Sequence, residues 1–179
     1  MQVIPYTSKY KEQVQKVCIS QSTSRFKDEI AQKATLALYC DEYIDHEVAF
    51  LLVNDQDIVC GYVLCAPDLK HYEECMQPYA QILKEIDAEK YQRFLDTLDV
   101  HGKLYDQYPA HLHIDLLEEC TGGGNGSKLM NTLLSYLKEN NVKGIMITVD
   151  PNNLRACAFY KKMGFSKYVP EGFILVQTL

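Results

Sequence analysis

A glycine-rich segment has the clearest chemical character in this sequence of 179 residues. It reads Thr121-Gly122-Gly123-Gly124-Asn125-Gly126-Ser127, and it lies between an apolar run and a set of leucines at helical spacing. Glycine permits a positive φ and has no Cβ, so a ligand can approach the main chain closely. Because the start of a helix adds unpaired N–H donors and the positive end of its dipole, the segment predicts a phosphate or pyrophosphate site.

A strand, a glycine turn and a helix in this order are compatible with three kinds of phosphate ligand. A Walker loop needs wider glycine spacing and a lysine before the hydroxyl residue, whereas Ser127 precedes Lys128 here. A Rossmann loop needs a glycine where Ser127 stands, and an acid at the next strand tip, whereas Glu139 falls inside the expected helix. The third ligand is the pyrophosphate of coenzyme A. A flexible glycine turn without a ligand is the structural alternative, although three consecutive glycines lose much entropy on folding.

A second set of candidate residues alternates along the strand expected before this loop. His111, His113 and Asp115 fall on one face of the strand, and apolar residues fall on the other. An imidazole or carboxylate here could take a proton from an attacking amine, directly or through water. A structural His–Asp network is the alternative. A metal site is the less favoured reading, because the rest of the chain offers no obvious further ligands, and we predict none.

The hydrophobic pattern predicts the elements that position these residues. Strands are expected at 3–4, 48–53, 58–66, 112–117 and 142–149, with the last strands at Tyr168 and 173–178. Helices are expected at 10–18, 26–39, 129–137 and 153–163, with two short helices in segment 68–108 and a connection at 43–46. The order predicts an α+β fold, an α/β sandwich with a mixed, mostly antiparallel sheet. One parallel crossover joins 112–117 to 142–149.

Length and composition bound the class of protein. We expect a single domain over 1–179, with a helical insert at about 68–108. A net charge of −6 without a basic cluster argues against nucleic acid, and no apolar run is long enough to cross a membrane. Seven cysteines without a CxxC pair indicate reduced, buried thiols. With no secretory signal at the start, they predict a cytoplasmic protein.

Two segments together resemble the GNAT family of N-acetyltransferases. The family's coenzyme A loop, Gln/Arg-x-x-Gly-x-Gly/Ala, falls on Thr121–Gly126. A second signature, Asn-x-x-Ala-x-x-Phe-Tyr followed by Gly-Phe, falls on Asn153–Phe165. The two occur in the family's order with a strand between them. A narrower resemblance is to the acetyltransferase-like domain of O-GlcNAc hydrolases and its free-standing bacterial relatives. It rests on the segment His111–Asp115 and on the helical insert before it.

The resemblance implies the GNAT fold, acetyl-CoA as cosubstrate, no metal, and a role for each matching residue. Tyr160 would be the general acid that protonates the leaving thiolate, and its alternative is packing beside Phe159. The Leu116 N–H would polarise the thioester carbonyl, and Asp115 or His113 would be the base. The residues expected to bind the cofactor are Ile114, Leu116, Thr121, Gly122, Gly123, Gly124, Asn125, Gly126, Ser127, Asn153 and Tyr160. A plain helix cap is the alternative for Asn153.

The acceptor is expected to be an amine on a small molecule or a peptide, which attacks the thioester directly. Its site would be built from segments 20–43 and 68–108, and a homodimer is possible. Thr121 stands where the family has glutamine or arginine and brings neither charge nor amide. This departure supports an alternative function, a non-catalytic acyl-CoA-binding or interaction module with the same fold.

Overall fold

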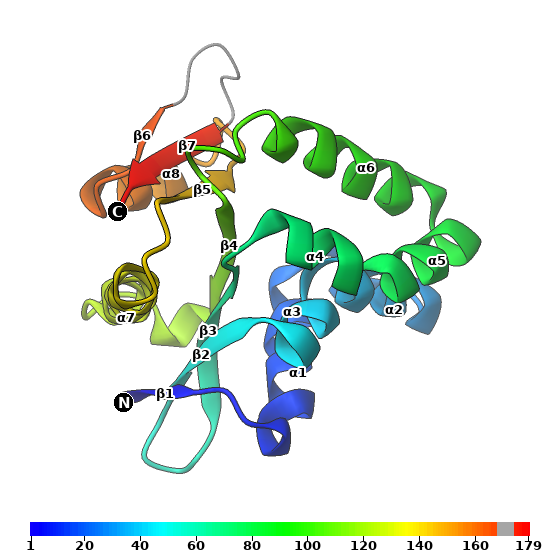
Figure 1. The fold of residues 1–179 in the computed structure, drawn as a ribbon. Coiled ribbons are helices and arrows are strands. Elements are labelled where there is room, and N and C mark those ends of the chain that lie inside the picture. Colours follow the sequence, from blue (N-terminus) through cyan, green and yellow to red (C-terminus); the bar gives the residue numbers. More distant parts are fainter. Residues whose placement is uncertain (168–173) are drawn as a thin grey trace.

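A seven-stranded sheet forms the centre of the computed structural model, which describes residues 1–167 and 174–179 (Figure 1). Its strand order is β1-β2-β3-β4-β5-β7-β6, and every neighbouring pair is antiparallel except β4 and β5. The strands are β1 (Gln2–Pro5), β2 (Val48–Val53), β3 (Val59–Ala66), β4 (Ala110–Leu116), β5 (Gly144–Thr148), β6 (Ser166–Lys167) and β7 (Ile174–Thr178). The predicted mixed sheet with one parallel pair is therefore confirmed. Tyr168 and Phe173, predicted in the last strands, lie outside the described residues.

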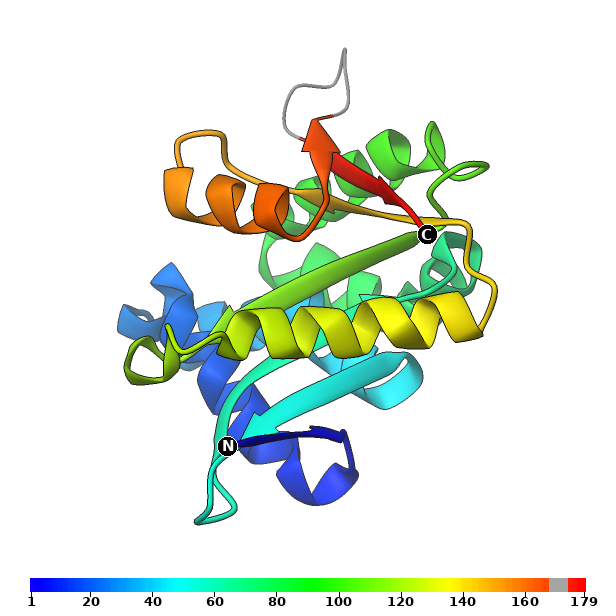
Figure 2. The same ribbon diagram turned by 90° about the vertical axis from the view of Figure 1, so that its left-hand side faces the viewer.

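Helices cover both faces of the sheet (Figures 1 and 2). One face carries α1 (Lys11–Gln21), α2 (Glu29–Tyr39), α3 (Asp41–His46), α4 (Leu69–Cys75), α5 (Gln77–Ile86) and α6 (Ala88–Gly102). The other face carries α7 (Asn125–Glu139) and α8 (Leu154–Lys162), which Figure 2 shows in front of the sheet. Short 3-10 helices occur at Ser8–Tyr10, Thr23–Phe26 and Glu118–Cys120. Among the described helices, none combines the length and apolar character that crossing a membrane requires.

Alternation along β4 places its side chains in two separate layers. Leu112, Ile114 and Leu116 pack with α7 and α8 in one hydrophobic cluster. On the opposite face, the rings of His111 and His113 contact Tyr43 of α3. The predicted division of this strand into an apolar and a polar face is confirmed. It follows from the two-residue period of a strand.

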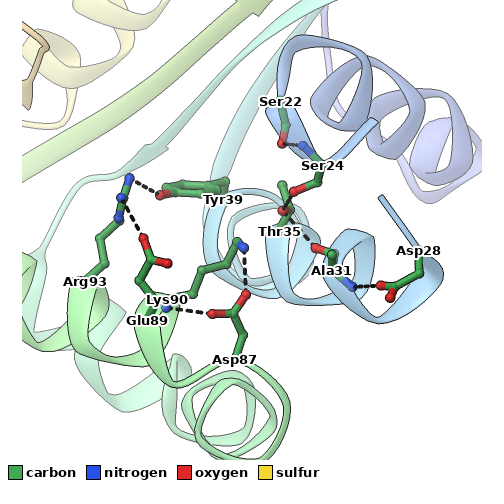
Figure 3. Close-up of polar contacts among 10 residues, drawn as sticks. All are labelled: Ser22, Ser24, Asp28, Ala31, Thr35, Tyr39, Asp87, Glu89, Lys90 and Arg93. Atoms are coloured by element: carbon green, nitrogen blue, oxygen red, sulfur yellow. Dashed lines mark hydrogen bonds and ion pairs between the residues drawn. The ribbon is translucent and has the colours of Figure 1, made fainter. Parts of the chain in front are cut away.

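The helices differ from the prediction in three places. Segment 43–46 is not a connection, because it belongs to α3, which buries Tyr43 and Ile44. The insert holds three helices instead of two, since Asp68 caps α4 by accepting from the N–H groups of Lys70 and His71. Helix α2 begins at Glu29 instead of residue 26, because the Asp28 carboxylate accepts from the Ala31 N–H (Figure 3).

Candidate active site

A cleft of about 560 Å³ lies where the end of β4, the glycine loop, the start of α7 and helix α8 meet. Strands β4 and β5 pair only at Ala110↔Ile145 and His111↔Met146. Beyond that point β4 runs on to Leu116 without pairing to β5, so one of its edges is open. The residues around the cleft are Gln21, Ile114, Asp115, Leu116, Glu118, Thr121, Gly122, Gly124, Asn125, Gly126, Ser127, Asn153, Arg155, Ala156, Phe159, Tyr160 and Lys162.

The glycine loop has a backbone that side-chain residues rarely adopt. Gly122, Gly123 and Gly124 have φ values of +84°, +54° and +79°, in the left-handed region. The Thr121 hydroxyl donates to the Glu118 carbonyl at 2.8 Å, and the Asn125 amide donates to the Cys120 carbonyl at 3.0 Å. These two side chains therefore hold the turn in place. Thr121 has a structural use that does not require the amide or charge usual in the family.

Backbone amides converge at this turn. The following N–H groups donate no backbone hydrogen bond within residues 1–167 and 174–179: those of Gly122, Gly123, Gly124, Gly126 and Ser127. Three of these glycines and Ser127 are immediately before or within the first turn of α7, whose dipole is positive at that end. Such a group of donors suits an anion with several oxygens, such as a pyrophosphate.

Two basic side chains at the cleft were not predicted from the sequence. Arg155 and Lys162 lie on α8 and line the same cleft as the glycine loop. Both are exposed, so their charges act near the surface. Their position inside the Asn153–Phe165 segment was the available signal, because residues on the helix that Asn153 begins can line the same cleft as Asn153.

Strand β4 directs alternate N–H groups into the open edge. The Leu117 N–H donates to the Cys60 carbonyl of β3 at 2.9 Å. Adjacent residues in a strand point their N–H groups in opposite directions, so those of Leu116 and Ile114 face away from β3. Gly61 of β3 allows β3 and β4 to approach each other closely here, because a Cβ on it would lie 2.7 Å from the Asp115 carbonyl oxygen.

Tyr160 lines the cleft from α8, and its side chain is packed between two other aromatic rings. The ring centroids of Phe159 and Phe165 lie 5.3 and 5.6 Å from that of Tyr160, which is 6% exposed. Burial, followed by the nearby Asp115 carboxylate, raises the pKa of the Tyr160 phenol above its ordinary value. The hydroxyl therefore stays protonated at neutral pH and can act as a donor.

Asp115 also lines the cleft, and it accepts a hydrogen bond from the Tyr62 hydroxyl at 2.6 Å. Burial raises the pKa of this carboxyl group, and the hydrogen bond from Tyr62 acts in the opposite direction. A carboxylate whose pKa is raised accepts a proton more readily than an ordinary aspartate.

A second cavity of about 270 Å³ adjoins β4 on the face covered by α2 and α6. Its lining residues include Tyr39, Tyr43, Tyr72, Arg93, Phe94, His101, His111, His113, Thr148 and Asp150. His113 faces this cavity, whereas Asp115, two residues further along the same face of β4, lines the cleft. The two hollows therefore open on consecutive stretches of one strand.

The histidines of the second cavity are neutral at physiological pH. Burial lowers the pKa of both His101 and His113 to about 4, and that of His111 also falls. His111 Nε2 lies 2.9 Å from the Tyr43 hydroxyl, and His101 Nε2 lies 3.1 Å from Thr148 Oγ1. In the described part of the chain, the Nδ1 atoms of His101 and His111 have no hydrogen-bond partner.

Polar contacts connect α2 and α6 beside this cavity (Figure 3). Arg93 donates to the Tyr39 hydroxyl at 3.4 Å and pairs with Glu89 at 3.7 Å. Both Arg93 and Tyr39 line the cavity, so they connect the predicted acceptor segments 20–43 and 68–108.

The structure brings most of the predicted site residues together. The cleft includes all the expected cofactor residues except Gly123, which belongs to the same loop but does not line it. Tyr160 and Asp115 share the cleft, and His113 is separated from them in the second cavity. Asn153 caps α8 by accepting from the Ala156 N–H at 3.0 Å, as the structural alternative expected. His101, which faces the second cavity from α6, was missed because no local pattern distinguishes it.

Comparisons with known proteins agree with this arrangement. Residues 18–165 match the sequence model of the acetyltransferase (GNAT) family. An uncharacterized N-acetyltransferase of Bacillus subtilis, YobR, is 32% identical over 97 residues, which are 54% of this chain but only 37% of that protein. The chain therefore matches little more than a third of the length of this curated relative.

Solved structures share the fold over nearly the whole chain. The structure of SsHAT has a TM-score of 0.78 and 26% identity, over 99% of this chain and 97% of that one. A GNAT acetyltransferase of Brucella melitensis, in complex with acetyl-CoA, has a TM-score of 0.58 and 14% identity over 99% and 87%. The narrower resemblance to O-GlcNAc hydrolases stays a prediction. The family and fold predicted from the sequence are confirmed: the chain belongs to the acetyltransferase (GNAT) family.

Proposed function

We propose that this chain transfers an acetyl group from acetyl-CoA, bound in the cleft, to an amine that enters through the second cavity. The observation that carries the proposal is that three features meet at one cleft: loop N–H groups without a backbone acceptor in the described chain, the open edge of β4, and the Tyr160 phenol. This set supplies an anion site, a donor for a carbonyl oxygen and a proton donor.

The loop amides would bind the pyrophosphate of coenzyme A. Arg155 and Lys162 would add positive charge to phosphates near the cleft mouth. The pantetheine arm would follow the open edge of β4, where the Ile114 and Leu116 N–H groups face. The side-chain oxygen of Asn153 caps α8. The amide N–H groups of the same side chain would therefore be available to the pantetheine arm.

In the transfer step, the acceptor nitrogen would attack the thioester carbon. The Leu116 N–H would stabilise the negative charge that develops on the carbonyl oxygen. As the carbon–sulfur bond breaks, Tyr160 would protonate the thiolate, and the new amide would lose one proton from nitrogen. Asp115 would accept that proton directly or through water, because its pKa is raised and it shares the cleft with Tyr160. His113 would be the less suitable base, because burial lowers its pKa to about 4 and its side chain lines the second cavity instead of the cleft.

The acceptor cavity supports an amine carried by an apolar or aromatic group. Its walls are tyrosines, Phe94 and neutral histidines, and Arg93 and Asp150 add the charged groups that could fix a polar substituent. Whether the amine belongs to a small molecule or a peptide follows from the test below. Homodimer formation and a cytoplasmic location stay predictions.

A binding measurement followed by a turnover measurement tests the proposal. Calorimetry should show one molecule of acetyl-CoA bound per chain, and a panel of aromatic, aliphatic and peptide amines should contain at least one that releases coenzyme A thiol. Binding without turnover on every amine would support the non-catalytic module that Thr121 suggested. Absence of acetyl-CoA binding would contradict both functions.

A further inference from the structure

A second group of chemically active side chains lies away from the cleft. Glu47 precedes β2, while His71 and Cys75 lie on α4, the first helix of the insert. Their potential ligand atoms all lie within 4.8 Å of one another. Val48, next to Glu47, pairs with Cys65 near the end of β3, whereas the cleft residue Leu116 pairs with Gly61 at its beginning. The group is therefore at the opposite end of β3 from the acetyl-CoA cleft.

We propose that Glu47, His71 and Cys75 bind a zinc ion, with solvent as the remaining ligand. Zinc takes thiolate, imidazole and carboxylate ligands together, whereas magnesium and calcium require oxygen ligands. The ion would link Glu47, which follows α3, to His71 and Cys75 on the first helix of the insert. It does not depend on acetyl transfer.

The spacing of the three side chains fits one shared ion. His71 and Cys75 are four residues apart on one face of α4, and Cys75 Sγ lies 3.5 Å from His71 Nε2. His71 Nε2 lies 3.9 Å from Glu47 Oε1. Atoms bound to one tetrahedral zinc at about 2.0–2.3 Å are about 3–4 Å from each other. A small adjustment of two side chains would therefore complete the geometry.

Glu47 gives an independent reason to expect a cation. Its side chain is only 3% exposed, and its Oε1 atom has no hydrogen-bond partner among the described residues. Buried carboxylate oxygens without a partner are rare, because they lose hydration without compensation. Glu42 is fully buried nearby, and neither of its oxygens has a partner in the described chain. Burial raises the pKa of Glu42 to about 9, so this group is protonated at neutral pH and adds no charge. The Glu47 oxygen without a partner is therefore the group that favours a positive ion.

The half-exposed side of the group gives the ion a path from solvent. The His71 side chain is 55% exposed, and Cys75 is half-buried. Zinc would displace the thiol proton of Cys75, and His71 would bind through its neutral ring. The exposed side leaves room for the water ligand.

The test uses the full chain after removal of metals by dialysis against a chelator. Zinc competition with a chelating dye should give one equivalent bound, and cobalt should give a thiolate-to-metal charge-transfer band. The variant Cys75→Ser should lose that band, and His71→Ala and Glu47→Gln should each weaken zinc binding by about tenfold or more. Two controls should bind zinc as the wild type does. Cys157→Ser changes a half-buried cysteine on α8, and His46→Ala changes an exposed histidine that adjoins Glu47 in the sequence but is not one of the three proposed ligands.

Circular dichroism without metal checks that each variant is folded, and Cys75→Ala repeats the test if the serine variant is not. Zinc should raise the melting temperature of the wild type and not that of the Cys75 variants. No competition with the dye, or equal zinc binding by wild type, Cys75→Ser and His71→Ala, would overturn the proposal. Loss of zinc binding in Cys157→Ser or His46→Ala would overturn the assignment of ligands.

Discussion

In the proposed mechanism, Tyr160 and Asp115 divide the proton chemistry because their surroundings differ in a simple way. Tyr160 is enclosed by apolar rings, so its phenol keeps its proton. Asp115 has the Tyr62 hydroxyl as a partner, and its raised pKa makes it the better acceptor. The motif around Tyr160 predicted its position, whereas the partner of Asp115 was not predictable, because Tyr62 is far away in sequence.

The variant Tyr160→Phe removes the proposed proton donor and keeps the ring that packs against Phe165. Its kcat should fall by about a hundredfold or more, which is the usual contribution of a general acid. Acetyl-CoA affinity measured by calorimetry should stay within about twofold, because the phosphate site is untouched. Tyr136→Phe, on α7 and away from the cleft, is the matched control and should keep wild-type kcat. An unchanged kcat in Tyr160→Phe would exclude the phenol as the acid.

The variants Gly122→Asn and Gly122→Asp test whether the loop binds an anion. Both residues tolerate the left-handed backbone better than other side chains, and a Cβ at this position meets no atom within 4 Å. They differ only in charge, so Gly122→Asp should bind coenzyme A about tenfold more weakly than Gly122→Asn. The same pair at Gly102, whose Cβ would also meet open space, should show equal affinity. Equal affinity for the Gly122 pair would mean that the phosphates bind elsewhere.

At the scale of elements, the site depends on where β4 separates from β5 and where two helices begin. The glycine loop and the Asn153–Phe165 segment are continuous in sequence, so most of the cleft could be predicted. The second cavity is lined by side chains from α2, α3, α4, α6, β4 and β5, and no local pattern connects them. The proposed zinc ligands could not be predicted from the sequence for the same reason, since Glu47 and Cys75 come from different elements.

Asn153 at the start of α8 offers a way to separate the helix cap from the proposed contact with coenzyme A. Asn153→Ala should lower the free energy of unfolding by about 1 kcal/mol, because the Ala156 N–H loses its acceptor. Asn153→Asp should keep the cap and melt like the wild type. Both should weaken coenzyme A binding, since the amide donor is lost.

Asp28→Ala is the matched control for this cap. It removes the equivalent acceptor at the start of α2 (Figure 3), so it should also cost about 1 kcal/mol in urea unfolding, with coenzyme A affinity unchanged. If Asn153→Asp bound coenzyme A as tightly as the wild type, Asn153 would be a cap and nothing more.

For the molecule as a whole, the sheet and its two helical layers followed from strand alternation and helical periodicity. The family signatures set the order of β4, α7, β5 and α8. The three-helix insert was only partly predicted, because the short helix α4 is defined by the Asp68 cap and has too few residues for a clear period. Burial of three histidines in one cavity is a property of the assembled fold, and it links stability to pH.

His101 should make the folded protein less stable in acid. Its pKa falls from 6.5 to about 4 on folding, because the ring is buried. As pH drops from 6.5 toward 4, the unfolded chain therefore takes up a proton that the native state does not. Stability is lost in that window and is fully present above it. This group alone should cost about 1–3 kcal/mol at pH 4.5.

Urea unfolding of wild type and His101→Gln at pH 7 and pH 4.5 measures this loss. The wild type should lose more stability than the variant between the two pH values, because carboxyl groups common to both proteins contribute equally. His46→Gln, which changes an exposed histidine, should follow the wild type. An equal loss in wild type and His101→Gln would show that His101 titrates normally.

A crystal structure of the chain with acetyl-CoA, or with an analogue whose thioester cannot be cleaved, tests the central claim most directly. We expect the pyrophosphate on the amides of residues 122–127, and the thioester oxygen within hydrogen-bond reach of the Leu116 N–H. The sulfur should lie beside the Tyr160 hydroxyl. A cofactor bound away from the glycine loop, or a thioester directed away from Tyr160, would contradict it.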